Sequence, residues 1–439
     1  MMNKPRENFN TRIGFVFAAA GSAIGLGNIW GFPTNAANNG GGAFLLVYLL
    51  VTLLLALPAL YAEVYIGNQS QRNPVGALGH ACKEKSESLG RSFGLFGLVG
   101  AFTMLSFYSI VAGWMLANAL SPLAELLSFN GITQWLSEDS ILRNLIFTPI
   151  FVLLAAVIIS KGVNKGIEKW SKRLMPLLLL MMILLIIYIQ FQAGALAGLQ
   201  KYLIPDIKQI TDANLIISAM GQAFFSLSLG VGGMMIYGSY MPKGQGIGKL
   251  VISIAALDTL IAFLAGLLII PALYVAQHAG QHVFSQGDLI GEGQLIFQVL
   301  PTLFYSMGNI GLMVACVFFS LLSIAALTST ISSTEVPVAY FVEEKSLTRK
   351  QATWLTSIIV LTASTTIIAF FEPLFGLVIQ MLTTFIQPLS CLFYFLTVSW
   401  LWRKGNKLRQ SPTLFLRLLA YYLGIVCPIL LSIVFYHAL

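Results

Sequence analysis

The stretch GSAIGLGN at residues 21–28 interrupts an apolar segment that extends over residues 11–38. A second apolar segment, at 214–239, is interrupted in the same way by FSLSLGVGG at residues 225–233. Unpaired backbone groups are costly in hydrocarbon, so unwound chain persists there only where protein, water, an ion or a ligand pairs with it. Each interruption is therefore a candidate binding site.

Helix packing is the alternative explanation for the first interruption. Gly21 and Gly25 are four residues apart, as in the GxxxG pattern that lets two membrane helices approach closely. The interruptions fall, however, in the first and sixth predicted spans, which are corresponding positions of two five-helix halves. Paired breaks of this kind favour an inverted-repeat transporter, with ligand and ions at the midplane between half-helix ends.

The composition extends this interpretation to the whole chain. Of the 439 residues, 57% are hydrophobic and only 10% are charged, whereas about a quarter of an average soluble domain is charged. A spanning helix needs about 20 apolar residues, and we predict eleven spans, at 11–38, 41–69, 91–125, 140–159, 167–189, 214–239, 247–276, 307–342, 351–371, 374–401 and 413–437. The predicted fold class is an all-α membrane protein with two inverted five-helix repeats, broken helices 1 and 6, and one extra helix. The repeats are expected at 1–189 and 190–401, and the eleventh helix at 402–439.

The basic residues predict how these spans are oriented. With the amino terminus in the cytoplasm, every one of the 25 Lys and Arg residues except Arg143, Lys201 and Lys208 lies in a cytoplasmic segment. Positive-inside orientation therefore explains the net charge of +8 better than nucleic acid as a partner. The polar start MMNKPRENFN lacks the apolar core of a signal peptide. We expect a multi-pass protein of the plasma membrane, in bacteria the inner membrane, with its carboxyl terminus outside.

The cysteines and histidines give no sign of a metal centre or disulfide. Cys82, Cys316, Cys391 and Cys427 are widely separated, and a cysteine in an apolar run behaves as a small hydrophobe. His278 and His282 have helical spacing but no accompanying metal motif, so a solvated loop face is the preferred interpretation.

Six motifs in order along the chain resemble the neurotransmitter:sodium symporter family, in its bacterial amino-acid branch. They are GSAIGLGNIWGFP at 21–33, NNGGGAF at 38–44, SFYSIVAGW at 106–114, GQAFFSLSLGVGGMMIYGSY at 221–240, DTLIAFLAG at 258–266 and ALTSTISS at 326–333. The resemblance implies a sodium-coupled symporter that carries a neutral amino acid by alternating access. It also implies two Na⁺ ions, which favour hard oxygen ligands such as the carbonyls of a partly unwound helix.

The resemblance implies the residues of both sodium sites. The first would use the carbonyl of Ala23, the carbonyl and hydroxyl of Ser226, the side chains of Asn28 and Asp258, and the substrate carboxylate. The second would use the carbonyls of Gly21, Ile24 and Ala325 and the hydroxyls of Thr328 and Ser329. An alternative for these hydroxyls is a bond to a carbonyl of their own helix.

Asp258 is an ionisable residue inside an apolar span, and such a residue marks a functional site because an unpaired buried charge is costly. Many family members carry Asn at this position and require chloride nearby. An aspartate here would supply the negative charge that chloride supplies elsewhere, so no chloride is expected.

The substrate pocket implied by the resemblance combines residues of the first, third, sixth and eighth spans: Ala23, Leu26, Gly27, Met104, Tyr108, Phe225, Ser226, Ser228, Val231, Ser329 and Ser333. The Leu26 and Gly27 amides lie near a half-helix end and would hold a carboxylate, with the Tyr108 hydroxyl assisting. Phe225 would close over the ligand. Val231 in place of a bulkier floor residue favours a large or aromatic substrate, although Met104 adds volume on another wall and Ser333 would suit a polar substrate tip.

The chain departs from the family at its outer gate. The usual Arg and Asp of that gate are Gly31 and Ile379 here, so the outer gate must close by packing or water. The cytoplasmic gate is retained as Arg6 with Glu343, near Tyr240 and Glu335.

Two other functions stay open beside amino-acid symport. The same scaffold would suit a transporter of another small zwitterion, or an amino-acid sensor that binds without turnover. A membrane enzyme is disfavoured, because the sequence has no nucleophile motif, metal signature or nucleotide loop. The oligomeric state is open.

Overall fold

The computed structural model describes residues 12–138, 140–243, 246–285, 288–289, 297, 299–402 and 413–438. Nine segments of this part of the chain are long and apolar enough to cross a membrane. They consist of α3 (Gly42–Val51) with η2 (Thr52–Ala56) and α4 (Leu57–Ser70); α6 (Lys83–Leu126); α8 (Ile141–Ile159); η3 (Val163–Glu168) with α9 (Lys169–Gln190); α13 (Ile247–His278); α16 (Gly308–Glu344); α17 (Arg349–Ala369); α18 (Phe371–Gln380) with η6 (Met381–Ile386), α19 (Gln387–Leu396) and η7 (Thr397–Leu401); and α21 (Leu414–Tyr421) with η8 (Tyr422–Val426) and α22 (Cys427–Ala438).

The two segments predicted to break are interrupted in the structure. The first consists of α1 (Arg12–Ala23), η1 (Gly27–Gly31) and α2 (Phe32–Asn38), and the other of α11 (Ala213–Ser226) and α12 (Gly233–Ser239). None of these pieces is long enough to span a membrane alone. The nine continuous segments agree with the other nine predicted spans in order, whereas the total of eleven stays a prediction.

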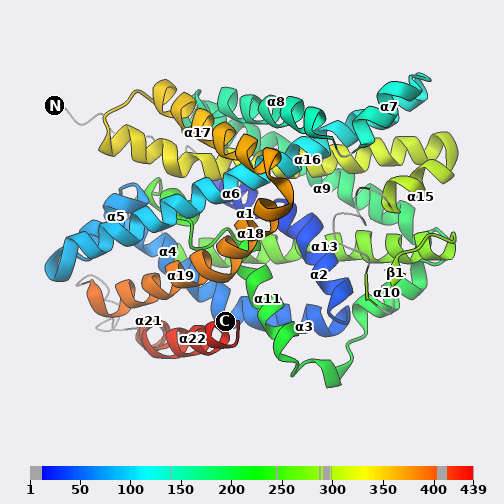
Figure 1. Cartoon of the computed structure of the whole chain (residues 1–439). Helices are drawn as coiled ribbons and strands as arrows, with labels where there is room; N and C mark the ends of the chain where they lie inside the picture. The colour runs from blue at the N-terminus through cyan, green and yellow to red at the C-terminus, as the bar shows by residue number, and fades with distance from the viewer. Residues whose placement is uncertain are drawn as a thin grey trace.

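Short elements connect the spans. They are α5 (Pro74–Ala81), α7 (Asn130–Ser137), α10 (Ala195–Leu203), η4 (Ile207–Gln209), α15 (Leu300–Ser306), and a hairpin of β1 (Phe284–Ser285) and β2 (Asp288–Leu289). In Figure 1, α7, α10, α15 and the hairpin lie at one end of the long helices, and α5 lies at the opposite end. The connections predicted to be outside therefore gather together, away from those predicted to be cytoplasmic.

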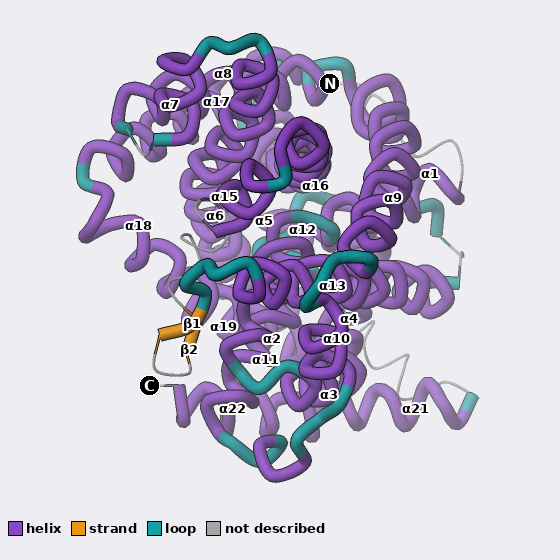
Figure 2. Tube along the Cα trace, turned by 90° about the vertical axis from the view of Figure 1, so that its right-hand side faces the viewer, coloured by secondary structure: helices purple, strands orange, loops and turns teal. Residues whose placement is uncertain are grey.

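The long helices surround the interrupted ones. α16 packs along α6, and α1 packs against α16 and α13. Seen along the helices, α2, α11 and α12 lie near the middle, with α8 and α22 toward the edge (Figure 2). The two breaks are thus enclosed by protein, as irregular backbone at membrane depth requires.

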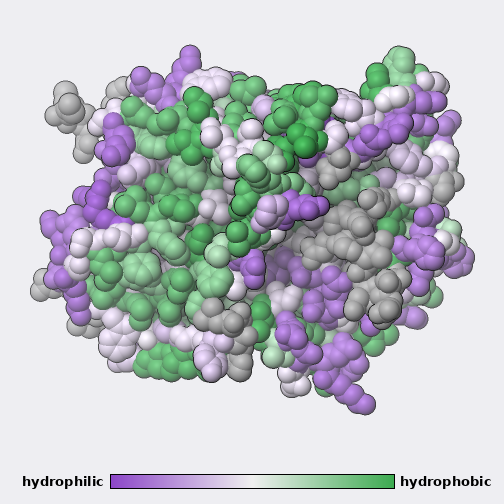
Figure 3. All heavy atoms as spheres, viewed as in Figure 1, coloured by the Kyte–Doolittle hydropathy of each residue, from purple (hydrophilic) through white to green (hydrophobic). Residues whose placement is uncertain are grey.

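The surface has the polarity of a membrane protein. Figure 3 shows hydrophilic residues gathered at the two ends of the helices and a hydrophobic belt between them. Many large apolar side chains are exposed, among them Leu53 at 61% and Ile358 at 58%. An exposed apolar belt of this extent is unfavourable in water and suits a lipid environment.

Candidate substrate and sodium sites

The backbone groups freed by the first break bind side chains, most of which belong to distant segments of the chain. The amide of Leu26 donates to the Tyr108 hydroxyl at 2.9 Å, and the amide of Gly25 donates to the Asn28 side chain at 3.1 Å. The carbonyl of Ser22 accepts from the hydroxyls of Ser228 and Ser329, each at 3.1 Å. The break is therefore held open by side chains of α6, α16 and the second interrupted segment.

Gly25 is the point where these elements meet most closely. A Cβ atom at this position would lie 2.3 Å from the Tyr108 hydroxyl and 2.9 Å from Ser329 Cβ. Any side chain at residue 25 would push α1 away from both α6 and α16. Close approach, which was the alternative interpretation of the glycine pattern, thus operates together with the break rather than instead of it.

The second break is a run of turns that includes three residues with positive φ. Ser228 has φ of 51°, and Gly230 and Gly232 each have φ of 82°. We call residues 227–232 the unwound segment. Glu63 of α4, which is fully buried, accepts from the amides of Gly230 at 3.1 Å and Met235 at 3.3 Å. The Glu63 carboxylate thus takes the place of the backbone carbonyls to which these amides would donate in a continuous helix.

Three residues predicted for the first sodium site come together in the structure. Asn28 Nδ2 lies 2.8 Å from Ser226 Oγ and 2.7 Å from Asp258 Oδ1, and Ser226 Oγ donates to both Asp258 carboxylate oxygens at 3.0 and 2.9 Å. All three side chains are completely buried. Ala23, the fourth predicted residue, is the last residue of α1. The group combines a carboxylate, an amide and a hydroxyl, a donor set that suits a hard cation.

The residues predicted for the second sodium site lie where α1 passes α16. A Cβ atom at Gly21 would lie 3.6 Å from Thr328 Cβ. Ser329 bonds across the interface to Ser22, whereas the Thr328 hydroxyl donates to the carbonyls of Ile324 at 3.2 Å and Ala325 at 2.9 Å in its own helix. Thr328 therefore bonds to carbonyls of its own helix, which was the alternative to sodium binding. Ser329 instead bonds to a carbonyl of another helix. Ile24 is buried beside the break.

A cavity of about 320 Å³ opens beside these groups, at the end of the molecule predicted to be outside. We call it the outer cavity. Its lining includes three predicted substrate residues, Leu26, Tyr108 and Phe225. Phe225 lies over Gly27, whose Cβ position would be 3.1 Å from the ring, and its ring stacks near that of Phe107 at a centroid distance of 6.4 Å. Phe225 therefore lines the cavity and lies against Gly27, while its closing over a ligand stays a prediction.

Seven other predicted substrate residues are not among the described residues that line the outer cavity. Ala23, Met104, Ser226, Ser228, Val231, Ser329 and Ser333 are all buried and, in the described part of the chain, do not line the outer cavity. Val231 lies against α6, because its Cγ1 would be 3.4 Å from a Cβ atom at Gly100. Three of the predicted substrate residues therefore line the outer cavity in the described part of the chain, and the grouping of all of them into one pocket stays a prediction.

The two positions of the missing outer gate both line the outer cavity. Gly31 lies on η1 and Ile379 on α18, and none of the described lining residues is charged. Beside Gly31, Gln222 donates to the Gly27 carbonyl at 2.7 Å and accepts from Asn35 at 3.3 Å, and Ser218 donates to Asn35 at 3.0 Å. Neutral amides and hydroxyls therefore connect α2 to α11 near the outer gate, where this sequence lacks the Arg and Asp of the usual ion pair.

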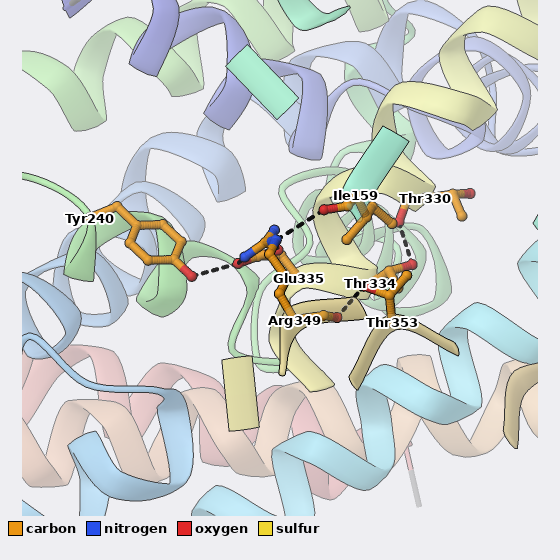
Figure 4. A network of polar contacts seen from close by, with 7 residues as sticks. All are labelled: Ile159, Tyr240, Thr330, Thr334, Glu335, Arg349 and Thr353. Carbon is orange, nitrogen blue, oxygen red and sulfur yellow. Dashed lines mark hydrogen bonds and ion pairs between the residues drawn. The ribbon is translucent and has the colours of Figure 1, made fainter. Parts of the chain in front are cut away.

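Charged residues dominate the opposite end. Glu335, fully buried, accepts from the Tyr240 hydroxyl at 2.5 Å and forms an ion pair of 2.5 Å with Arg349, which also donates to the Ile159 carbonyl at 3.0 Å. Figure 4 shows the Tyr240 hydroxyl and the Arg349 guanidinium meeting at the Glu335 carboxylate. We call Tyr240, Glu335 and Arg349 the Glu335 cluster.

The predicted partner of Glu343, Arg6, lies outside the described residues. In the described part, the Glu343 carboxylate accepts from the backbone amide of Asn73 at 2.7 Å and from its side chain at 3.0 Å. The adjacent Glu344 pairs with Arg91 at 2.6 Å. The predicted gate residues Tyr240 and Glu335 are therefore in contact, while the pairing of Arg6 with Glu343 stays a prediction.

Sequence reasoning missed Arg349, Glu63 and Gln222. Arg349 was used only to orient the chain, yet a buried acid such as Glu335 requires a cation, and Arg349 follows it at the start of the next helix. Glu63 is an acid inside an apolar span, so the argument used for Asp258 would have found it. Gln222 lies inside a quoted motif, but only its contacts give it a role.

Comparison with known proteins completes the description of the site. The model of the sodium:neurotransmitter symporter family matches residues 6–146 and 140–407. YhdH of Bacillus subtilis, an uncharacterized sodium-dependent transporter, is 36% identical over 364 residues, which are 80% of this chain and 76% of that protein. MJ1319 of Methanocaldococcus jannaschii, also an uncharacterized sodium-dependent transporter, is 29% identical over 459 residues, with 98% and 89% coverage. The crystal structure of MhsT in complex with L-phenylalanine superimposes with a TM-score of 0.86 at 34% identity, covering 99% of this chain and 100% of that one.

Proposed function

Because this chain belongs to the sodium:neurotransmitter symporter family, we propose that it imports a neutral L-amino acid by sodium-coupled symport and alternating access. The family consists of transporters, which agrees with the sequence-based expectation that the protein is not an enzyme. The observation that carries the proposal is the buried group of Asn28, Ser226 and Asp258 beside the break at Gly25–Leu26.

The break supports recognition of a carboxylate. The Leu26 amide already points at the Tyr108 hydroxyl, and both are donors that a substrate carboxylate would accept from. The similar protein MhsT was crystallised with L-phenylalanine, which supports a neutral amino acid with a large or aromatic side chain. Val231 would then form the floor beneath that side chain.

Two sodium ions would flank this substrate. The first would be held by the Ala23 carbonyl, Asn28, Ser226 and Asp258, and the second by the Gly21, Ile24 and Ala325 carbonyls with Thr328 and Ser329. The Asp258 carboxylate would balance the charge of the first ion, so transport would need no chloride. The second site would rest on neutral oxygens.

The fold is proposed to serve this cycle through its repeats, 1–189 and 190–401, with 402–439 as an additional helix. We place the protein in the plasma membrane of a bacterium, with the amino terminus in the cytoplasm and the carboxyl terminus outside. The positive-inside distribution supports this orientation.

Uptake by proteoliposomes containing the purified full chain tests the proposal. A sodium gradient should drive accumulation of labelled L-phenylalanine, and collapse of the gradient should abolish it. Counterflow separates transport from sensing, because a sensor would bind the amino acid without exchanging it. Binding without counterflow would reject the transporter.

Replacing sodium chloride with sodium gluconate tests the role of Asp258. Uptake should be the same in both salts for the natural protein. In the Asp258→Asn variant, the residual uptake should be higher in chloride than in gluconate, since the fixed charge is then missing. Loss of uptake of the natural protein in gluconate would contradict the proposed charge balance.

A further inference from the structure

The backbone of the unwound segment is paired from two sides, and the proposed function uses only part of this arrangement. Glu63 of α4 takes the Gly230 amide. On the other side, Gln387 Nε2 donates to the Leu229 carbonyl at 3.0 Å and the Tyr394 hydroxyl donates to the Gly230 carbonyl at 3.3 Å. Both of these donors belong to α19, and both side chains are buried.

The approach of α19 is as close as backbone permits. A Cβ atom at Gly230 would lie 2.6 Å from the Gln387 carbonyl oxygen and 2.7 Å from its Cα. Gly230 also has φ of 82°, a conformation that L side chains rarely adopt. A side chain at residue 230 would therefore clash with α19, and moving the unwound segment away from α19 would leave the two carbonyls unpaired at membrane depth.

The span that contains α19 also reaches the outer cavity, through α18 and η6. Ile379, Thr383 and Thr384 line the cavity, and Gln387 follows Ile379 by eight residues, a distance of about 12 Å along a helix. Ile386, between them, packs against Gly100 of α6, where a Cβ atom would lie 2.6 Å from its Cγ2. Val231, the proposed pocket floor, contacts the same place on α6 and directly follows Gly230 in the chain.

We propose that Gln387 and Tyr394 are positioning residues. Their hydrogen bonds to the Leu229 and Gly230 carbonyls, which we call the clamp, fix the position of the unwound segment relative to α19. This position in turn sets the side-chain size that the substrate site accepts. This inference rests on the proposed function for its substrate, but the clamp itself is a property of the fold. A large substrate would reach Val231, while alanine would not. Loosening the clamp should therefore weaken binding of large amino acids selectively.

Two variants remove the clamp with little change in volume. Tyr394→Phe removes one hydroxyl, and Gln387→Met removes the amide, whose Oε1 has no hydrogen-bond partner among the described residues. Matched controls lose the same chemistry elsewhere: Tyr422→Phe loses a tyrosine bond of 2.8 Å to the Leu54 carbonyl, and Gln190→Met loses a glutamine bond of 2.9 Å to the Leu267 carbonyl.

Binding of L-phenylalanine and L-alanine to the purified full chain at saturating sodium is the first measurement. We expect Kd for L-phenylalanine to rise about tenfold in both clamp variants, the loss expected for an unpaired buried carbonyl. Kd for L-alanine should stay within about twofold, and both controls should match the natural protein. Equal losses for the two amino acids, or none, would overturn the specificity role.

Amide hydrogen exchange over residues 227–232 is the second measurement and needs no substrate. Exchange should accelerate about tenfold in the clamp variants and stay unchanged in the controls. If the natural protein binds neither amino acid, the proposed function fails, and exchange alone then decides the clamp. Unchanged exchange in Tyr394→Phe, which conserves nearly the whole side chain and so folds even where Gln387→Met does not, would overturn the proposal.

Discussion

The outer cavity and the Glu335 cluster lie at opposite ends of the same helices, and different chemistry holds them. In the described residues, the outer cavity has no charged lining side chain, and Gln222, Asn35 and Ser218 connect its walls. The other end pairs Glu335 with Arg349 at 2.5 Å. Neutral hydrogen bonds contribute about 0.5–1.5 kcal/mol each, whereas separating a buried ion pair leaves an uncompensated charge that costs about 3–5 kcal/mol. The outer end should therefore open at lower cost than the inner end.

The two proposed sodium sites show the same contrast within the site itself. The first contains the Asp258 carboxylate, while the second relies on carbonyls and on the hydroxyls of Thr328 and Ser329. Loss of one charged ligand and loss of two neutral ones should thus have different consequences. Variants at the two ends of the helices and in the proposed substrate and sodium sites between them make the contrast between charged and neutral groups measurable.

The largest effect should come from Arg349→Ala. Among the described residues, this change leaves the buried Glu335 carboxylate with the Tyr240 hydroxyl as its remaining hydrogen-bond partner, at a cost of about 3–5 kcal/mol. Uptake in proteoliposomes should fall about 100-fold or more. The double variant with Glu335→Gln should recover a large part of the loss, because the unpaired charge is gone, and Arg417→Ala at an exposed position should have no effect. Failure of the double variant to recover would mean that Arg349 acts by something other than this charge.

Val231→Phe should have the next largest effect. Val231 is fully packed against α6 at Gly100, and overpacking of this kind costs about 1–3 kcal/mol. Binding of L-tryptophan or L-tyrosine should therefore weaken far more than binding of L-alanine, measured at saturating sodium. Equal losses would remove Val231 from the pocket floor, and with it the preference for large substrates.

Removing the hydroxyls of the second sodium site should have a moderate effect. In the double variant Thr328→Ala with Ser329→Ala, the sodium concentration for half-maximal uptake should rise about tenfold, or about 1.4 kcal/mol, because two neutral ligands are lost. Ser323→Ala is a suitable control, since the Ser323 hydroxyl donates to the Phe319 carbonyl of its own helix. A double variant with unaltered sodium dependence would show that the second site lies elsewhere.

The smallest effect should come from a charge introduced into the neutral outer cavity. Ile379→Asp should lower uptake at low ionic strength by about 1 kcal/mol, a factor of about five, through repulsion of the substrate carboxylate. About 0.5 M salt should relieve most of this loss, because the Debye length is then only a few ångströms. Ile379→Asn, with nearly the same shape and no charge, should stay insensitive to salt. Salt sensitivity of the natural protein would weaken the contrast between the two ends.

Sequence reasoning located both breaks, because glycine and small polar residues inside apolar runs leave few other structures available in a membrane. It also brought Asn28, Ser226 and Asp258 together through their motifs. It did not find Arg349, whose charge fits the orientation rule equally well without a buried partner. Gln387 and Tyr394 were missed for a different reason. A polar residue in a span gives no indication of which backbone group it faces, and that depends on how closely Gly230 approaches α19.

The outer cavity has one wall from beyond the two predicted repeats. Phe435 of α22 lines the cavity and contacts Phe385 of η6 edge to face at a centroid distance of 6.0 Å. A chain that ended before residue 413 would retain both breaks and both proposed sodium sites, yet its cavity would lose this aromatic wall. Lipid acyl chains are apolar enough to enter such an opening and compete with the substrate. We therefore expect the last helix to seal the cavity against the membrane, and shortened versions of this transporter should be tested for entry of lipid into the cavity as well as for folding.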